Sequence, residues 1–506
     1  MVKKIRRNAR GYFTALLFGA LILAFGITFT TQSTAQSVSV VSPATLRVGE
    51  KLTYSVSFGK IRNAGSAETH VVSRGKLGGK DAIELRAKVK TLELVSAAFF
   101  LLDEARVAYI APDSGLPLYI SSLSLDNGFP KEKVHNYLNQ STSNFDLLSL
   151  LYKLRELGGI GTFPLSEDDQ LSTAIVQVAA PERVKTDAGE FDTSVSTIQS
   201  ELLSQNGIKD FRINFSTDEF RVPVLVRFKT VKGEFKLTLS LIVLSEPDLP
   251  APSPTPIPTP IPAPTPLPSP TPVLYVENLP LLPELGFQLG ELLTYRIASG
   301  IKPVGILSLN ARERKLFEKS DSLRLTATIS GVEQGINSIR MGDVADVQVD
   351  PDTLTPTRIE YKFATELLGL NQTVTFDKRS GKISFGGAQP VDSPIGTHSL
   401  LSLIYAMRSF NLKPSKDPSN PVNDTRVAVF WENQSYVFTL RPSNPEDILL
   451  NGEKVSAQLV TINTGNAQLD ALAPKVWLGT ETRIPVRFSV GEYFADLITI
   501  TSNLPK

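Results

Sequence analysis

The chain has three histidines, and these are the first residues to test for metal binding or acid–base chemistry. His70, His135 and His398 are far apart, and none lies two to five positions from another. A zinc site needs about four protein ligands, or three and a water, so this spacing predicts no metal site. His398 stands where the first half of the chain has Phe145. We interpret it as a surface residue beside a helix rather than a catalytic base.

Two short patterns resemble parts of enzymes. Ser57-Phe-Gly-Lys60 and Ser73-Arg-Gly-Lys76 have the spacing in which a lysine activates a serine, but the Ser-Asp-Asn and Lys-Thr-Gly partners of penicillin-recognising enzymes do not occur. Gly159-Ile-Gly161 lacks the third glycine of a dinucleotide loop, and Pro164 stands where the helix of such a loop should begin. The sequence therefore predicts neither a catalytic serine nor a bound cofactor.

Glu104 and Asp343 are acidic residues at matched positions of the two halves, each just before a predicted strand. Two carboxylates can act as acid and base in the cleavage of a glycan. The alternative is that each carboxylate pairs with an arginine or a turn amide at the end of its strand. We favour this structural interpretation, which leaves an envelope hydrolase as the weakest hypothesis for the chain.

The best candidates for a ligand-binding site are a tyrosine and an arginine that both halves keep one helical turn apart. Tyr152 precedes Arg155 by three positions, and Tyr405 precedes Arg408 by the same spacing. Residues three apart are neighbours on a helix surface, so each pair could contact a ligand. The alternative is that the tyrosine packs at the rim of a barrel while the arginine binds carbonyls near the helix end.

Both pairs lie in leucine-rich segments that predict one helix in each half. Residues 146–155 match residues 399–408, and Asn144 or Thr397 is placed to cap the exposed amides of the first turn. We expect the apolar side of each helix to cover an opening in a sheet. The first half has Asp146 where the second half has a serine.

Around these helices the chain repeats one pattern of strands and turns. Residues 52–58 alternate apolar and polar, as expected of an antiparallel strand with one buried and one wet face. The chain therefore contains two copies of one mainly β domain. The matched motifs are Gly49-Glu50-Lys-Leu-Thr-Tyr54 with Gly290-Glu291-Leu-Leu-Thr-Tyr295, Ile83 to Val89 with Leu323 to Ile329, Pro112-Asp113-Ser114 with Pro351-Asp352-Thr353, Arg221-Val-Pro223-Val with Arg483-Ile-Pro485-Val, and Gly233-Glu-Phe235 with Gly491-Glu-Tyr493.

These motifs resemble a bacterial envelope family known as domain of unknown function 3108. The resemblance rests on the opening strand, the Pro-Asp-x turn, the Leu-Ser-Leu-x-Tyr-x-x-Arg helix and the late Arg-x-Pro-Val strand, and it covers about residues 46–244 and 287–502. It implies two tandem antiparallel β-barrel or half-barrel domains, each with one short amphipathic helix, in an exported protein. The family supplies no catalytic residues to carry over.

Four segments divide the chain: a leader at residues 1–35, a first domain at 36–248, a linker at 249–273 and a second domain at 274–506. Proline occupies every even position from 250 to 272. Each ring fixes φ and disfavours helix at the residue before it, so the linker is expected to be extended polyproline II. Fully extended, it could separate the domains by roughly 70 Å.

The leader has the order of a secretory signal: basic residues, an uncharged apolar run at 11–30, and the small residues Ser33-Thr34-Ala35. The apolar run is also long enough to span a bilayer, so an uncleaved anchor that contacts the membrane is the alternative. Either way the bulk of the chain is expected in the periplasm or at the cell surface. The chain has no cysteine, so it can form neither disulfides nor thiolate metal sites.

The charge balance argues against nucleic acid as a partner. Five of the 52 basic residues lie in residues 1–35, so 47 remain against 51 acidic residues. Our leading hypothesis is a non-enzymatic protein that binds an apolar small molecule or an envelope partner, and it predicts a continuous apolar cavity in at least one domain. The alternative is a structural spacer or assembly module of the envelope.

Overall fold

The computed structural model of the chain divides into two compact units of antiparallel strands. One unit is made of residues 1–74 and 80–273 and the other of residues 75–79 and 274–506, and we call them the first and the second domain. Most of the expected leader and the whole expected linker lie outside the residues that the structure describes. The described residues are 22–23, 45–91, 103–126, 129–167, 170–231, 233–243, 285–317, 320–336, 339–364, 371–414 and 425–502.

The sheet of the first domain is an antiparallel meander whose first and last long strands pair. Strand β2 (Lys51–Phe58) pairs with β13 (Gly233–Val243), so the sheet runs from β7 through β2 and β13 to β8. The edges are therefore β7 and β8. The 13 strands in the described residues also include β1 (Ile22–Leu23), which pairs with β10, and β3 (Ile61–Leu77), β4 (Lys80–Thr91), β5 (Asp103–Ile110), β6 (Pro117–Asp126), β7 (Phe129–Asn136), β8 (Gly161–Glu167), β9 (Gln170–Thr186), β10 (Gly189–Ser200), β11 (Lys209–Ser216) and β12 (Pro223–Thr230).

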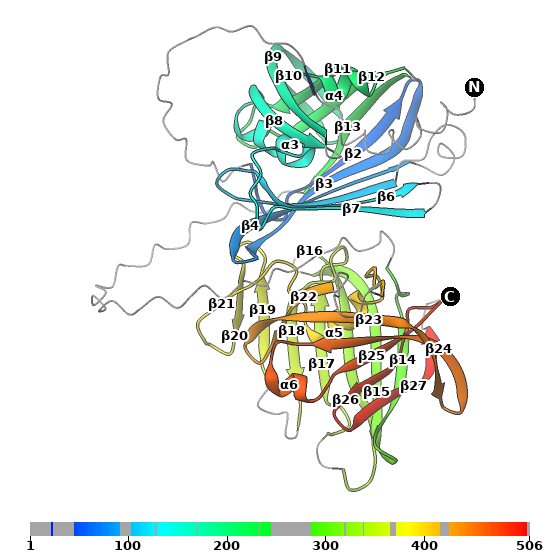
Figure 1. The fold of residues 1–506 in the computed structure, drawn as a ribbon. Coiled ribbons are helices and arrows are strands. Elements are labelled where there is room, and N and C mark those ends of the chain that lie inside the picture. The colour runs from blue at the N-terminus through cyan, green and yellow to red at the C-terminus, as the bar shows by residue number, and fades with distance from the viewer. Residues whose placement is uncertain are drawn as a thin grey trace, which may run out of the picture. The chain divides into compact units, whose positions relative to one another are not determined.

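The second domain repeats this meander. Strand β14 (Glu291–Ser299) pairs with β27 (Tyr493–Ser502) as β2 pairs with β13, and Figure 1 shows the strands of both domains. This repeated order confirms the predicted mainly β fold of tandem antiparallel sheets. The 14 strands in the described residues also include β15 (Lys302–Phe317), β16 (Ser320–Val332), β17 (Val344–Val349), β18 (Pro356–Lys362), β19 (Thr373–Asp377), β20 (Lys382–Phe385), β21 (Val391–Asp392), β22 (Thr425–Trp431), β23 (Gln434–Leu450), β24 (Glu453–Asn463), β25 (Lys475–Gly479) and β26 (Pro485–Val490).

The predicted alternation of buried and exposed residues is confirmed in β2, where every second residue is buried. In β4 the alternation breaks at Glu84, which the sequence pattern placed on the wet face. Glu84 is buried and accepts hydrogen bonds from Ser73 at 2.8 Å and from Arg86 at 2.7 Å. A buried carboxylate is stable only with such partners, and the strand pattern alone does not reveal them.

Each domain has one main helix between the edge strands, α3 (Leu147–Glu156) or α5 (Leu400–Ala406). Helix α3 packs against β4, β5 and β8, and α5 packs against β16, β17 and β22. Each helix therefore contacts both halves of its meander. Just before each helix the chain also pairs with an edge strand, through Phe145 with β8 and His398 with β22. This placement agrees with the expectation that the helix covers an opening in the sheet.

The caps of these helices differ from the predicted ones. The caps are Asp146 and Ser399, whereas the sequence analysis placed Asn144 or Thr397 there. The carboxylate of Asp146 accepts the amides of the second and third helical residues at 3.2 and 3.1 Å. The hydroxyl of Ser399 accepts the amide of the third residue at 3.0 Å. The prediction was wrong because it counted the cap residue as the first residue of the helix.

Two short helices were not predicted. Helix α4 (Glu201–Gln205) follows β10 and α6 (Ala467–Ala471) follows β24, so both domains have one at the same place. Five residues are too few to show a helical period in the sequence. The prediction of one helix per domain is therefore wrong, since each domain has two within the described residues.

Candidate functional site

A buried ion pair joins the main helix of the first domain to its first long strand. The guanidinium of Arg155 binds the carboxylate of Glu50 through Nη1 to Oε1 at 2.5 Å and Nη2 to Oε2 at 3.0 Å. It also donates to the carbonyls of Phe220 at 2.8 Å and Arg221 at 3.2 Å. Burial opposes the charge of Arg155, but the Glu50 carboxylate outweighs it and raises the pKa of the guanidinium.

Arg221 completes this arrangement from the loop before β12. Its Nη1 donates to the last carbonyls of α3, those of Arg155 at 3.2 Å and Glu156 at 2.7 Å. Its backbone has a φ of 44°, which is uncommon for a residue with a side chain. The two arginines thus bind each other's carbonyls and close the end of the helix. We call Glu50, Arg155 and Arg221 the arginine clasp of the first domain.

The second domain has the same clasp in Glu291, Arg408 and Arg483. Arg408 binds Glu291 through two hydrogen bonds at 2.5 and 3.1 Å. Arg483 also has a positive φ, 57°, and donates to the carbonyls of Met407 at 3.0 Å and Phe410 at 3.1 Å. Burial lowers the pKa of Arg483. The clasp therefore accounts for three of the motifs that the two halves share.

Of the four predicted site residues, Arg155 and Arg408 belong to the clasp, and Tyr152 and Tyr405 lie close to it. The guanidinium of Arg155 lies 5.2 Å from the centre of the Tyr152 ring, and Tyr405 packs edge-on against Phe287 with ring centres 4.8 Å apart. Arg155 and Arg408 both give two donors to a glutamate. The sequence analysis missed the two glutamates, although both stand in its first repeated motif.

An apolar cavity of about 100 Å³ lies beside the clasp in the first domain. One wall is helix α3, and the facing walls come from β2 to β4 and β10 to β13. Only one of its lining residues, Glu68, carries a charge, and Glu68 pairs with Lys51 at 3.0 Å. The other lining residues are Tyr54, Ala67, Thr69, Val89, Leu147, Leu148, Leu150, Leu151, Leu154, Ile198, Phe211, Ile213, Pro223, Val226 and Leu237.

Two hydroxyl groups interrupt this apolar lining. Tyr54 and Thr69 are 4% and 8% exposed, and neither hydroxyl forms a hydrogen bond of normal geometry among the described residues, although the Thr69 hydroxyl is close enough to the Tyr54 and Tyr152 phenols to act on both as a hydrogen-bond partner. The hydroxyl of Tyr152, just outside the lining, is in the same state. Burial raises the pKa of the Tyr54 and Tyr152 phenols, so both remain protonated and can donate hydrogen bonds. An unsatisfied buried hydroxyl is costly, and here the hydroxyls of Tyr54 and Thr69 both border one cavity.

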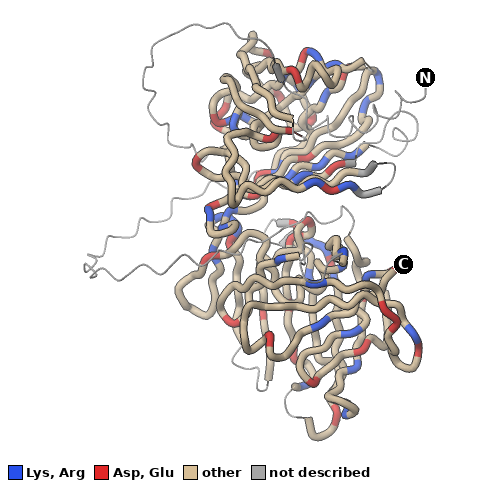
Figure 2. Tube along the Cα trace, viewed as in Figure 1, with Lys and Arg blue, Asp and Glu red and all other residues tan. Residues whose placement is uncertain are grey.

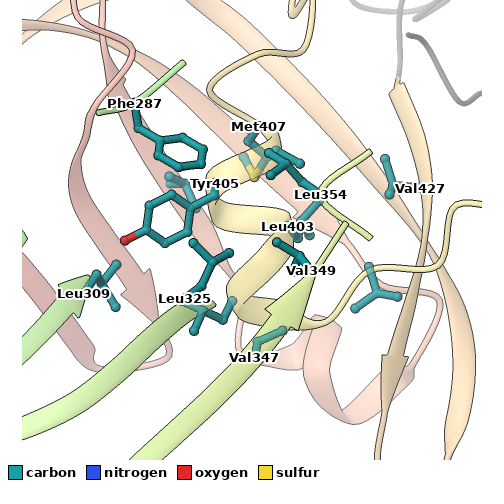
Figure 3. Packing of buried hydrophobic residues seen from close by; sticks show 14 of the residues in the cluster. Phe287, Leu309, Leu325, Val347, Val349, Leu354, Leu403, Tyr405, Met407 and Val427 are labelled. Atoms are coloured by element: carbon teal, nitrogen blue, oxygen red, sulfur yellow. The ribbon is translucent and has the colours of Figure 1, made fainter. Parts of the chain in front are cut away.

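The matched place in the second domain is lined differently, with larger residues at two positions and a smaller one, Ala495, at the position of Leu237. By strand register Thr69 corresponds to Leu309 and Val226 to Phe488. Tyr54 corresponds to Tyr295, whose hydroxyl donates to the carbonyl of Pro485 at 2.8 Å. The Phe488 ring packs against Tyr295 with centres 5.2 Å apart, and Figure 3 shows Leu309 among the packed side chains of this core.

A second buried charge cluster is confined to the first domain. Arg106 binds Glu167 through both guanidinium nitrogens and lies 3.5 Å from Asp146 and from Glu104. Burial opposes its charge, but Glu167, Glu104 and Asp146 outweigh it and raise its pKa. The positions of Arg106, Asp146 and Glu167 hold Ala345, Ser399 and Trp431 in the second domain, as the strand registers and the helix caps show.

The two acids that suggested a hydrolase thus have different structural partners. Glu104 belongs to the cluster around Arg106, whereas Asp343 accepts the amides of Arg340 and Ala364 at 2.8 Å each. Asp343 borders an open depression of about 510 Å³ on the second domain. Its carboxylate oxygens are occupied by the loops around it, so they organise those loops.

The interpretation of His398 as a surface residue is wrong. It is 4% exposed, and its Nδ1 lies 3.1 Å from the carbonyl of Leu354 and 3.3 Å from the hydroxyl of Ser402.

The described residues contain no group of three or more acids and histidines that could hold a metal ion. Figure 2 shows basic and acidic residues interspersed along both domains. None of the described helices is long and apolar enough to cross a bilayer.

The comparison with known families confirms the resemblance for the first domain. Residues 53–240 match the family described as "Protein of unknown function (DUF3108)". The second domain, outside this match, repeats the same strand order and the same clasp. The chain is therefore a tandem β-sheet protein whose residues 53–240 are similar to this family. No curated protein matches the chain.

Solved structures with some likeness share little sequence with the chain. A β-barrel-like protein of domain of unknown function 1849 from Brucella abortus has 10% identity and a TM-score of 0.26, covering 40% of this chain and 100% of that one. A proposed lipoprotein from Parabacteroides distasonis has 11% identity and a TM-score of 0.20, covering 39% and 97%. A proposed exported protein with a YmcC-like fold from Bacteroides fragilis has 11% identity and a TM-score of 0.19, covering 39% of this chain and 97% of that one. Scores this low carry no argument about function.

The clasp predicts a large loss of stability when one partner is removed. Glu50→Gln leaves Arg155 charged and buried without its counterion, which should lower the free energy of unfolding by about 3 to 5 kcal/mol. Glu190→Gln is the control, because the Glu190 and Arg183 side chains are 49% and 70% exposed and such pairs contribute at most about 1 kcal/mol. Denaturant unfolding, with hydrogen exchange of α3 peptides, measures both. Equal losses would contradict a stabilising role for the clasp.

The charge cluster around Arg106, which belongs to the first domain, predicts that removing the two helix caps lowers the free energy of unfolding by unequal amounts. Ser399→Ala removes a cap alone and should cost about 1 kcal/mol. Asp146→Ala removes a cap and also a carboxylate from the surroundings of Arg106, so it should cost about 2 to 4 kcal/mol. Hydrogen exchange of peptides from α3 and α5 assigns each loss to its domain. A cost for Asp146→Ala no larger than that for Ser399→Ala would show that the cluster adds nothing.

Proposed function

We propose that the protein is an exported binding protein of the bacterial cell envelope, whose first domain holds an apolar molecule without chemical change. The observation that carries this proposal is the apolar cavity between α3 and the sheet. Apolar surface removed from water there contributes about 25 cal/mol per Å² to binding. The cavity is of the kind that the apolar-ligand hypothesis requires, and it lies inside the residues that match the family.

The size of the cavity limits the ligand. Its volume of about 100 Å³ is below the roughly 150 Å³ of an apolar protein cavity that admits benzene, and below the roughly 300 to 1,000 Å³ of pockets for drug-sized molecules. A straight alkyl chain is narrower than a ring. We therefore assign the cavity to the end of such a chain, with the rest of the molecule leaving the domain.

The leader supports the location of this function. Residues 1–35 read as a secretory signal or an uncleaved anchor, and both place the two domains beyond the inner membrane. Apolar molecules with long chains are components of every bilayer. The proposal therefore places the protein close to a source of its ligand, in the periplasm or at the cell surface.

A structural role is the second candidate, and the second domain favours it. Leu309 and Phe488 stand where the first domain has the smaller Thr69 and Val226, and Ala495 stands where it has the larger Leu237. A copy whose interior is packed differently can serve as a spacer or an assembly surface. On this proposal the two domains divide binding and structure between them.

The buried acids give no support to an envelope hydrolase. A glycan-cleaving pair needs one carboxyl group that gives a proton and one that stays ionised beside the substrate. Glu104, Asp146 and Glu167 surround Arg106 and pair with its guanidinium. None of them lines the apolar cavity. Binding without bond chemistry is therefore the reading that the first domain supports.

Filling the cavity tests the proposal. Val226→Phe introduces the residue that the second domain has at the matched position, and it should abolish binding of n-hexane, measured as the rise in unfolding temperature in hexane-saturated buffer. Val178→Phe is the control, because Val178 is 52% exposed on β9 and should leave the rise unchanged. No rise in the unaltered protein, or an equal rise with Val226→Phe, would remove the proposal.

A further inference from the structure

We infer that the ligand of the first domain is a straight-chain molecule with a neutral oxygen group at the buried end, such as an alcohol, an ester carbonyl or an unionised acid. This inference rests on the proposed function and adds the chemistry of the head group. It follows from which polar atoms face the cavity, which of them already have partners, and which charges lie nearby.

The hydroxyls of Tyr54 and Thr69 provide the binding groups. Both residues line the cavity, both are more than nine-tenths buried, and their hydroxyls lie close to each other without forming a hydrogen bond of normal geometry. They come from neighbouring strands, because Tyr54 of β2 pairs with Ala67 of β3, two residues before Thr69. Two adjacent hydroxyls can bind a single oxygen atom, one donating to it and the other donating or accepting.

The second domain shows how the same fold treats these groups when no ligand oxygen is needed. Tyr295 donates its hydroxyl to the carbonyl of Pro485 at 2.8 Å, and Leu309 replaces the threonine. The hydroxyls that match Tyr54 and Thr69 are therefore satisfied or absent in the second domain, whereas those of Tyr152 and its match Tyr405 lack a partner of normal geometry in both domains. Buried polar groups without partners are rare in folded proteins, and here the two of them meet at an apolar cavity.

The charges around the cavity select a neutral head group over an anion. The nearest guanidinium, Arg155, already binds Glu50 and two backbone carbonyls. Glu68, the one charged side chain that lines the cavity, already pairs with Lys51, so neither of them offers a free positive charge to a carboxylate. An unpaired buried charge costs far more than a neutral group that forms hydrogen bonds. A carboxylate would bury its charge here without a free cation.

The exposure of the lining residues indicates how the molecule lies. Tyr54 and Thr69 are buried, whereas Leu151, Phe211 and Leu237 are only partly buried. We place the ligand oxygen at Tyr54 and Thr69 because their hydroxyls line the cavity, and the three partly buried residues mark a side that meets solvent. The oxygen enters first, and the alkyl chain then follows the apolar walls outwards.

Three six-carbon probes test this assignment on the full chain. Dissociation constants of n-hexane, n-hexanol and hexanoate at pH 8, measured by ligand-observed NMR, should show hexanol as the tightest ligand and hexanoate as the weakest. Tyr54→Phe and Thr69→Val remove one hydroxyl each without changing the shape of the side chain. Each should weaken hexanol about tenfold and leave hexane unchanged.

Stability supplies an independent measurement. Tyr54→Phe removes a hydroxyl whose contact with Thr69 is not a hydrogen bond of normal geometry, so the unfolding temperature should change little. The matched control is Tyr295→Phe, which breaks a buried hydrogen bond to Pro485 and should lower the unfolding temperature while hexanol still binds. A fall for Tyr54→Phe as large as that for Tyr295→Phe would show that its hydroxyl has a structural role.

The outcomes separate the inference from the proposal beneath it. If hexane fails to bind, the proposed function is wrong. If hexane and hexanol bind equally well and Tyr54→Phe changes neither, the domain binds apolar chains but the assigned head group is wrong. If hexanoate binds most tightly, the ligand is an anion and the neutral head group is overturned.

Discussion

A glutamate beside the first long strand and an arginine at or just after the end of the main helix form a two-bonded ion pair inside each domain. The meander joins its first and last strands and leaves two open edges, and the helix lies between them. Glu50 and Arg155 fix that helix from one side, and Arg221 holds its end from the other. The placement of every side chain on the inner face of the helix depends on this constraint.

The two domains keep the clasp and differ in what the helix encloses. In the first domain the helix faces Val226 and Thr69 across a small apolar space. In the second domain the matched residue Leu309 belongs to the hydrophobic core, and Phe488 packs against that core. Two domains that share the strand order and the clasp but differ in their interior residues are expected if one domain binds a ligand and the other has a structural role. The clasp is common to both domains, and on the proposed function the interior of the first domain carries the specificity.

The sequence predicts the fold better than the site, for physical reasons. Strand alternation and repeated motifs are local, so the tandem β architecture could be recognised. The pairing of Glu50 with Arg155 depends on a contact across 105 positions, which no local pattern contains. The burial of His398 also depends on long-range pairing, in that case with β22. A cavity is harder still, because its volume is the space left by side chains from seven strands and a helix.

The most direct test of the account is a crystal structure of the full chain under xenon pressure. Xenon binds dry apolar cavities irrespective of the natural ligand. The account predicts a xenon atom in the first domain between α3 and the residues around Val226, and none at the matched place beside Phe488 in the second domain. An empty first domain, or equal occupancy in both domains, would contradict it.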